Sequence, residues 1–140
     1  MLRVALLTSP AVLLLLAPVG VYAVDIRRGS DVVVAAGETV DDDLIAAGQN
    51  LTIAGHITGD LYTGAQTVLV SGTIDGDLIG GAQSVTVDGT VRGSIRAAGA
   101  QVTINGTVGR NVSTFAQRIT INPGGRVDGS LLGSGQELMA

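Results

Sequence analysis

Apolar and polar residues follow one another along this chain in a pattern that recurs every 17 residues. The copies begin at Asp43, Asp60, Asp77, Ser94, Asn111 and, in truncated form, Ser130. The fifth copy carries two extra residues around Pro123 and Gly124. A fixed period of this kind is the signature of a repeat architecture, in which each copy forms one structural unit.

Four columns of the repeat hold only leucine, isoleucine or valine. In the second copy these columns are Leu61, Val68, Val70 and Ile74. Between the second and third columns lies a position that is threonine in four of the five copies. This apolar–polar–apolar order is typical of a strand with one buried face.

The repeat predicts an all-β fold, a parallel β-helix in which each copy forms one coil. Seventeen residues are too few for a strand–helix–strand unit. We expect corners with positive φ at the glycines that follow the strands, Gly55, Gly72, Gly89, Gly106 and then Gly124 or Gly125. Stacked coils would place the aliphatic columns inside as ladders. At the usual strand spacing, about six coils make a rod roughly 30 Å long.

The chain divides into three parts. Residues 1–23 have a short positive region at Arg3, an apolar core and small residues before position 24, so they are predicted to be a signal peptide or, alternatively, an uncleaved N-terminal anchor. Residues 24–42 form a lead-in and an irregular first coil. Residues 43–140 are the β-helix repeats. The first part predicts export to the periplasm or the cell surface.

Composition supports a narrow solenoid rather than a globular core. The chain has 21 glycines and only 2% aromatic residues, which suits an interior of aliphatic stacks. It contains no cysteine, which excludes disulfides, thiolate metal sites and thiol nucleophiles.

Charge is divided along the chain. Nine acidic residues and no basic ones lie between Asp31 and Asp88, whereas five arginines and no acidic residues lie between Gly89 and Arg126. On a rod this division is a dipole, which would bias copies toward head-to-tail association and weaken in salt.

Few polar residues suggest chemistry. The column of Asp43, Asp60 and Asp77 could bind a cation, but serine and asparagine replace aspartate later in the column, which favours a turn role. The single histidine, His56, lies in an outward column and is expected to be surface decoration. No catalytic, cofactor-binding or metal-binding residue is therefore predicted.

Other polar positions also favour structural roles. The glutamine column is expected to form an amide ladder between coils; its members are Gln49, Gln66, Gln83, Gln117 and Gln136. Chance explains the three Asn-x-Ser/Thr sequons, which begin at Asn50, Asn105 and Asn111. Net acidity and the lack of aromatic residues argue against nucleic-acid binding, and no nucleotide-binding loop is present.

The coil ends are the remaining candidate for function. The ends of a β-helix leave unpaired strand edges, which template further pairing. Stacking at the C-terminal end is expected to bury Leu131, Leu132 and Leu138. The chain is therefore expected to be a non-catalytic scaffold that associates with itself.

The repeated phrases resemble the coils of bactofilins, the polymer-forming cytoskeletal proteins. They begin at Gly72, Gly89 and Gly106, and the resemblance extends over about Val32 to Leu138. It implies a right-handed, three-sided β-helix that polymerises through its ends without nucleotide, in non-polar filaments, and that scaffolds envelope machinery, often on a membrane. Because bactofilins proper are cytoplasmic and this chain begins with an export signal, it is more similar to exported bactofilin-like proteins.

Two other functions remain open from the sequence. The chain could be a monomeric exported rod that binds a glycan or an envelope protein. It could also be an enzyme on a β-helix, but acyltransferases need a hexapeptide period, and a fold alone assigns no chemistry.

Overall fold

The computed structural model describes residues 24–134 and 137–139, so the predicted signal peptide or anchor lies outside the described residues. The long strands are β1 (Asp25–Val34), β3 (Leu44–Ile53), β5 (Leu61–Val70), β7 (Leu78–Val87), β9 (Ile95–Ile104) and β11 (Val112–Ile121). The short strands are β2 (Thr39–Val40), β4 (His56–Ile57), β6 (Thr73–Ile74), β8 (Thr90–Val91), β10 (Thr107–Val108) and β12 (Arg126–Val127). The last two strands are β13 (Leu131–Ser134) and β14 (Glu137–Met139). In the described part of the chain, no helix is long and apolar enough to cross a membrane.

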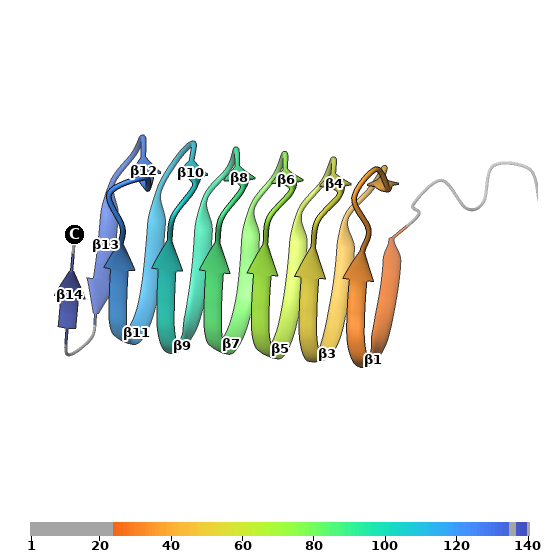
Figure 1. The fold of residues 1–140 in the computed structure, drawn as a ribbon, viewed down its shortest axis with the longest axis horizontal. Helices are drawn as coiled ribbons and strands as arrows, with labels where there is room; N and C mark the ends of the chain where they lie inside the picture. The colour runs from red at the N-terminus through yellow and green to blue at the C-terminus, as the bar shows by residue number, and fades with distance from the viewer. Residues whose placement is uncertain (1–23, 135–136, 140) are drawn as a thin grey trace, which may run out of the picture.

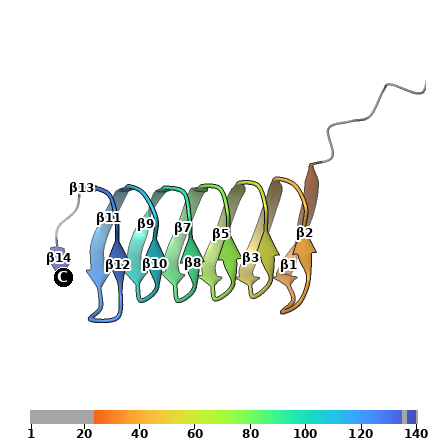
Figure 2. The same ribbon diagram turned by 90° about the horizontal axis from the view of Figure 1, so that it is seen from above.

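The strands form a parallel β-solenoid of about six coils, as the repeat predicts. The long strands stack in the order β1-β3-β5-β7-β9-β11-β13, with β14 also beside β11, and the short strands form a second sheet. The chain winds in a right-handed sense from coil to coil (Figures 1 and 2). Each long strand bends into two sides and each short strand makes the third, so the tube is three-sided.

Neighbouring coils are in strict register. Asp60 lies over Asp43 at an offset of 17 residues, and the same offset recurs through the middle of the rod. The first and last offsets are 19 residues. In both coils the extra residues lie between the long strand and the short strand, and in the first coil this corner contains Gly37 at a φ of 85°.

The aliphatic columns face one another inside the tube, as predicted. Leu61, Val68, Val70 and Ile74 are fully buried, and the same columns are buried in the other central coils. A further interior column of small side chains was not predicted; it includes Ala46, Ala97 and Thr114, all of them buried. Small side chains fit there because the larger aliphatic ladders fill the rest of the tube.

The expected positive φ at the strand-following glycines is wrong. Positive φ among the described residues is confined to Gly29, Gly37 and Gly80. Glycine is needed after the strands because coils approach closely: a Cβ on Gly72 would lie 2.0 Å from the carbonyl oxygen of Gly55. The same contact repeats at Gly89 over Gly72, so the column stacks glycine on glycine.

Replacing Ile74 with alanine should lower the free energy of unfolding by about 2–5 kcal/mol, because a buried aliphatic side chain is lost and a cavity remains. Thr73→Ala is the matched control, since Thr73 is the neighbouring outward residue of β6 and is only half-buried. Urea unfolding followed by circular dichroism measures both variants. Equal losses in the two variants would contradict an interior made of aliphatic ladders.

Candidate functional site

The ends of the solenoid are the first candidate site, because at each end the last of the described strands has no described strand on its outer side. β1 and β2 end the two sheets on one side of the rod. β12, β13 and β14 lie at the opposite end. Unpaired edges present backbone donors and acceptors that can pair with another chain. The geometry therefore allows further coils to be added at either end.

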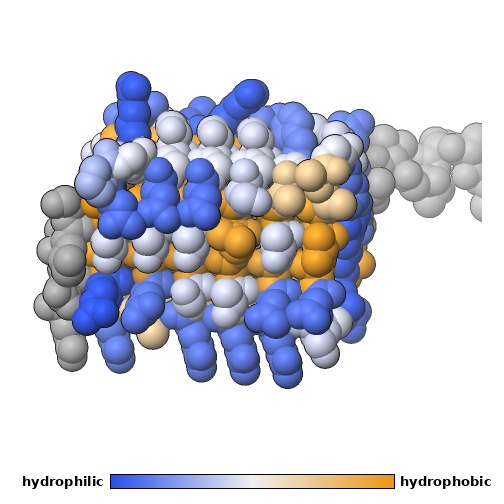
Figure 3. Space-filling model, in the orientation of Figure 1, coloured by the Kyte–Doolittle hydropathy of each residue, from blue (hydrophilic) through white to orange (hydrophobic). Residues whose placement is uncertain are grey.

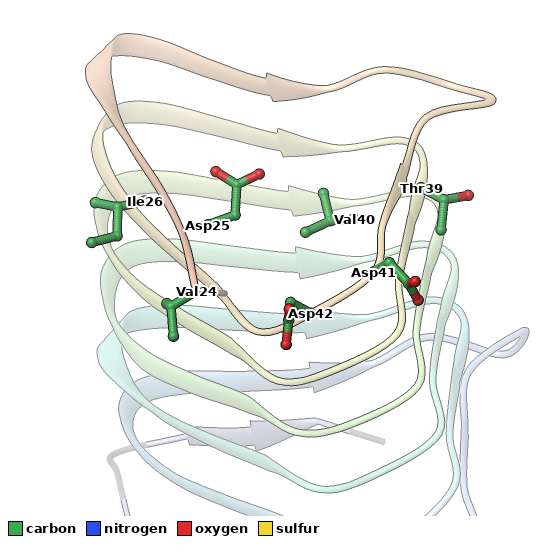
Figure 4. Close-up of a pocket in the computed structure, with 7 residues that line it drawn as sticks. All are labelled: Val24, Asp25, Ile26, Thr39, Val40, Asp41 and Asp42. Atoms are coloured by element: carbon green, nitrogen blue, oxygen red, sulfur yellow. The ribbon is translucent and has the colours of Figure 1, made fainter. Parts of the chain in front are cut away.

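At the N-terminal end, charged residues stand where apolar residues line the interior of later coils. The register places Asp25 over Leu44 and Arg27 over Ala46. In the view along the tube, the Asp25 side chain is directed toward the middle of the coil, beside Val40 (Figure 4). The sequence did not reveal this replacement, because these two residues lie in the lead-in outside the 17-residue period.

Arg27 joins two carboxylates at this end. Its Nη2 lies 3.0 Å from Asp25 Oδ2 and 2.5 Å from Glu38 Oε2. Its Nη1 donates to the carbonyl of Val33 at 3.2 Å, and Glu38 Oε1 accepts from the backbone N–H of Ala35 at 3.1 Å. The hydrogen bond from Arg27 lowers the pKa of Glu38, and the bonds to Glu38 and Asp25 raise the pKa of Arg27. We call Asp25, Arg27 and Glu38 the N-terminal ion cluster.

The C-terminal end is apolar by contrast. Ile121, Val127 and Leu131 pack against the core but remain partly exposed. Leu132, which end-to-end stacking is expected to bury, lies on the outer surface of β13 and is 70% exposed in the single copy. Leu138 belongs to β14, which pairs with β11, and its side chain lies outside the described part of the structure. The two ends therefore differ in chemistry.

The aspartate column is the second candidate, and it connects coils. Asp43 Oδ1 accepts the backbone N–H of Asp60 at 2.7 Å, and Asp60 and Asp77 accept from the next coil at the same distance. Ser94 and Asn111 make the equivalent bond with their own side-chain oxygens, at 3.3 and 2.9 Å. This explains why serine and asparagine can replace aspartate in the column. The carboxylates thus serve as acceptors for the neighbouring backbone, not only as local turn residues.

Glycines beside this column make room for the carboxylates. A Cβ on Gly76 would lie 2.0 Å from Asp60 Oδ1. Arg110 occupies the equivalent position one coil after Gly93, and there the underlying column residue is Ser94 rather than aspartate. Glycine is therefore replaced in the coil where the longer acceptor is absent.

Within the described residues, no group of three or more histidine, cysteine, aspartate or glutamate side chains is arranged to hold a metal ion. The acceptor role of the column is accordingly the one that its geometry supports.

His56 has partners that the sequence did not reveal. Its Nε2 lies 2.7 Å from Asp75 Oδ2, and Arg92 Nη1 lies 3.2 Å from the other oxygen of the same carboxylate. The three residues come from three successive coils on the short-strand side. The His56 side chain is 40% exposed, so this is a solvated polar bridge between coils, and exposed pairs of this kind contribute little stability.

The side-chain amide ladder forms in a different column from the expected one. Asn105 Nδ2 donates to Asp88 Oδ1 at 2.7 Å, and Asn122 Nδ2 donates to Asn105 Oδ1. In a separate column, inside the long strands, Asn50 Nδ2 donates to Asp31 Oδ1 at 2.9 Å. The glutamines of the described coils are exposed, and no hydrogen bond joins Gln49, Gln66, Gln83 and Gln117 in that part of the chain. Gln136 lies outside the described residues.

Replacing Gly76 with alanine should destabilise the fold by about 1–3 kcal/mol, because the new Cβ overlaps the Asp60 carboxylate and the coil must shift. Gly64→Ala is the control, since nothing lies within 4 Å of a Cβ there, and its effect should be neutral or slightly stabilising. Chemical unfolding of both variants and of the double variant Gly76→Ala/Asp60→Ser measures the effect. The shorter serine should restore part of the stability, and a double variant no better than Gly76→Ala would refute the steric explanation.

Tyr62 provides a spectroscopic probe of the acidic column. The charge of Asp60, with smaller contributions from Asp43 and Asp77, raises the pKa of Tyr62 above its ordinary value. In a Tyr22→Phe background, which leaves a single tyrosine, Asp60→Asn should lower this pKa, because the amide keeps the acceptor oxygen and removes the charge. Absorbance titration at the phenolate band measures it. An unchanged midpoint would mean that the carboxylate does not act on the phenol.

The comparisons with known proteins agree with this geometry. Residues 32–132 match the family model Bactofilin, described as polymer-forming cytoskeletal. Neither the search of curated proteins nor the search of solved structures found a match. The family match runs from the last three residues of β1 to the first two residues of β13, which is most of the solenoid. The chain therefore belongs to the bactofilin family of polymer-forming structural proteins.

Proposed function

We propose that this protein assembles end to end into filaments that act as a non-catalytic scaffold in the cell envelope. The observation that carries the proposal is the pair of ends, where β1 and β13 are the outermost long strands of the part of the chain that the structure describes. A joined copy would continue both sheets at the regular coil spacing. The family supports polymer formation as such, and it is a structural family rather than an enzymatic one.

The chemistry of the two ends favours joints between like ends. Joining the apolar C-terminal end to the N-terminal ion cluster would remove charges from water without new partners, which is costly. Two C-terminal ends would bury Val127 and Leu131 against their counterparts. Two N-terminal ends would bring ion clusters together with their pairing intact. This arrangement gives a non-polar filament, and it outweighs the head-to-tail preference expected from the charge division, because salt screens exposed charges.

The proposed location depends on residues 1–23. Their pattern is that of an export signal or an anchor, so the filament would lie in the periplasm or on the cell surface. An uncleaved segment would hold the filament on the membrane, where envelope proteins are its expected partners. Assembly would need no nucleotide, since only strand edges and apolar end surfaces take part.

Val127→Lys should reduce filament formation at least tenfold, because it places a charge in the apolar C-terminal end. Purified full-length protein is measured by sedimentation and negative-stain electron microscopy over a range of concentrations. Leu69→Lys is the matched control: it is an equally half-buried aliphatic position, but it lies on the outer surface of β5 in the middle of the rod.

Three results would contradict the proposal. Protein that stays monomeric at every concentration would favour a solitary rod that binds a glycan or an envelope protein. Equal losses in the two lysine variants would mean that the C-terminal end is not a joint. Filaments with visible polarity would refute joints between like ends.

A further inference from the structure

One outer face of the solenoid carries large apolar side chains that do not pack into the interior. It is the outer surface of the first half of each long strand. Seven large apolar side chains are strongly exposed among the described residues, and five of them lie on this face: Ile26, Ile45, Tyr62, Phe115 and Leu132. The half-buried Ile79 lies in the same row as Ile45 and Tyr62. We call these six residues the apolar face.

The neighbouring face shows the contrast. The second half of each long strand, which is turned toward the viewer in Figure 3, carries polar residues with hydrophobic patches between them, and hydrophilic side chains project from its lower border. Its outward row is threonine in four of the five full repeats. Exposed large apolar groups are thus more numerous on the apolar face, although Val33 is exposed in the outward row of the neighbouring face.

Beside the apolar row runs a flat row of small residues, Ala47, Gly64, Gly81 and Ala98. Nothing lies within 4 Å of a Cβ added to Gly64, and the nearest atom to one on Gly81 is 3.6 Å away. Neither glycine has a positive φ. Unlike the glycines at the corners, these two are required by nothing inside the chain. Glycine in a strand often marks a place where another backbone approaches closely.

A large side chain projects from the surface at the C-terminal end of the flat row. Phe115 continues the row and is 72% exposed. A shallow hollow lined by Ile79, Ala98 and Ser113 lies on one side of it, and a second hollow lined by Leu132 and Gly133 lies on the other. The apolar face therefore has a flat N-terminal half and a projecting C-terminal half.

Charge along the border of this face is divided in the same way. The corner that leads into the first half of each long strand carries Asp41, Asp42 and Asp60 near the N-terminal end. Farther along the rod the same corner carries Arg92 and Arg110, and the face itself carries Arg96. Two residues run against this division: Arg28 lies in the row of Ala47 at the N-terminal end, and Asp128 lies at the same corner of the last coil. An antiparallel second copy would bring the mainly acidic half of each copy against the mainly basic half of the other.

We propose that two copies of this chain pair side by side and antiparallel through the apolar face, about a twofold axis at β7. β7 is the central strand of the seven stacked in sequence, so the axis places β5 against β9, β3 against β11 and β1 against β13. Arg96 then faces Tyr62, Phe115 lies over Ala47, and Leu132 meets Ile26. A twofold axis along the rod, which would make the copies parallel, brings no acidic half against a basic half.

The size of the face sets the strength of the pairing. Seven strands at the usual spacing and five residues across give a contact of roughly 30 by 16 Å on each copy. The total area buried by the pair is then about 1,000 Å², which is below the range of stable interfaces and within that of weak, transient ones. We therefore expect a weak pair that a covalent trap can capture.

The chain has no cysteine, so one introduced cysteine supplies its only thiol and crosslinking reports on that position alone. Full-length protein carrying Gly81→Cys is treated with a short bismaleimide, which joins two thiols of facing copies by thioether bonds. Dimer yield should be at least tenfold higher than for Thr86→Cys, an outward position of the same strand on the neighbouring face. Position 81 lies in the middle of the rod, so copies joined only end to end hold their two thiols too far apart for a short bismaleimide. The result therefore does not depend on whether filaments form.

Other positions of the flat row distinguish the orientations. Ala47→Cys and Ala98→Cys should each give little dimer alone, whereas a mixture of Gly64→Cys and Ala98→Cys copies should give the mixed product. Equal yields at all positions would indicate parallel copies, and a maximum elsewhere in the row would refute the β7 axis. Yields no higher than that of Thr86→Cys would show that a second copy does not occupy this face. Each of these results overturns the proposal.

A second pair of variants tests the surface without relying on geometry at the axis. In the Gly81→Cys background, Ile45→Arg should lower dimer yield about tenfold, and Thr52→Arg, on the other face of the same strand, should not. Thermal unfolding confirms that both variants are folded. High salt should also lower the yield, because the acidic and basic borders are exposed. Equal yields for the two arginine variants would overturn the proposal.

Discussion

The structure depends on the stacking of each residue on its own counterpart in the next coil. Parallel pairing at a fixed offset of 17 residues satisfies the backbone and sets the distance between like side chains. Aliphatic columns then become continuous interior ladders, and acceptor side chains such as Asp60 reach the same backbone N–H in every coil. A residue that does not fit its column disturbs the packing against the coils on both sides. This explains why the columns vary so little in residue type and why a glycine, Gly76, lies over the Asp60 carboxylate.

The same constraint explains where function can reside. The interior is filled by ladders, so the remaining surfaces are the outer faces and the two ends. The ends differ, because the N-terminal coil replaces interior apolar residues with Asp25 and Arg27, whereas the C-terminal coil leaves Val127 and Leu131 partly uncovered. The two proposed joints would thus differ in chemistry, and the apolar side face is independent of both.

The strands, their burial and the number of coils could be predicted because a period of 17 is repeated often enough to separate inward from outward columns. The small interior column was missed, because alanine and threonine occur on either side of a strand. The roles of individual polar residues were also difficult: His56 acquires Asp75 and Arg92 only when three coils are stacked. The glycine corners were predicted in the right places for the wrong reason, since crowding between coils and not positive φ requires them.

By itself, the sequence determined the solenoid, since like residues at a constant interval can be buried together only by stacking. The tertiary structure alone decided what the surfaces are. The three sides of a coil are not marked in the sequence, so the gathering of Ile45, Tyr62 and Phe115 on one face depends on where each long strand bends. The ion cluster at the N-terminal end likewise depends on the 19-residue first offset, which brings Arg27 between Asp25 and Glu38.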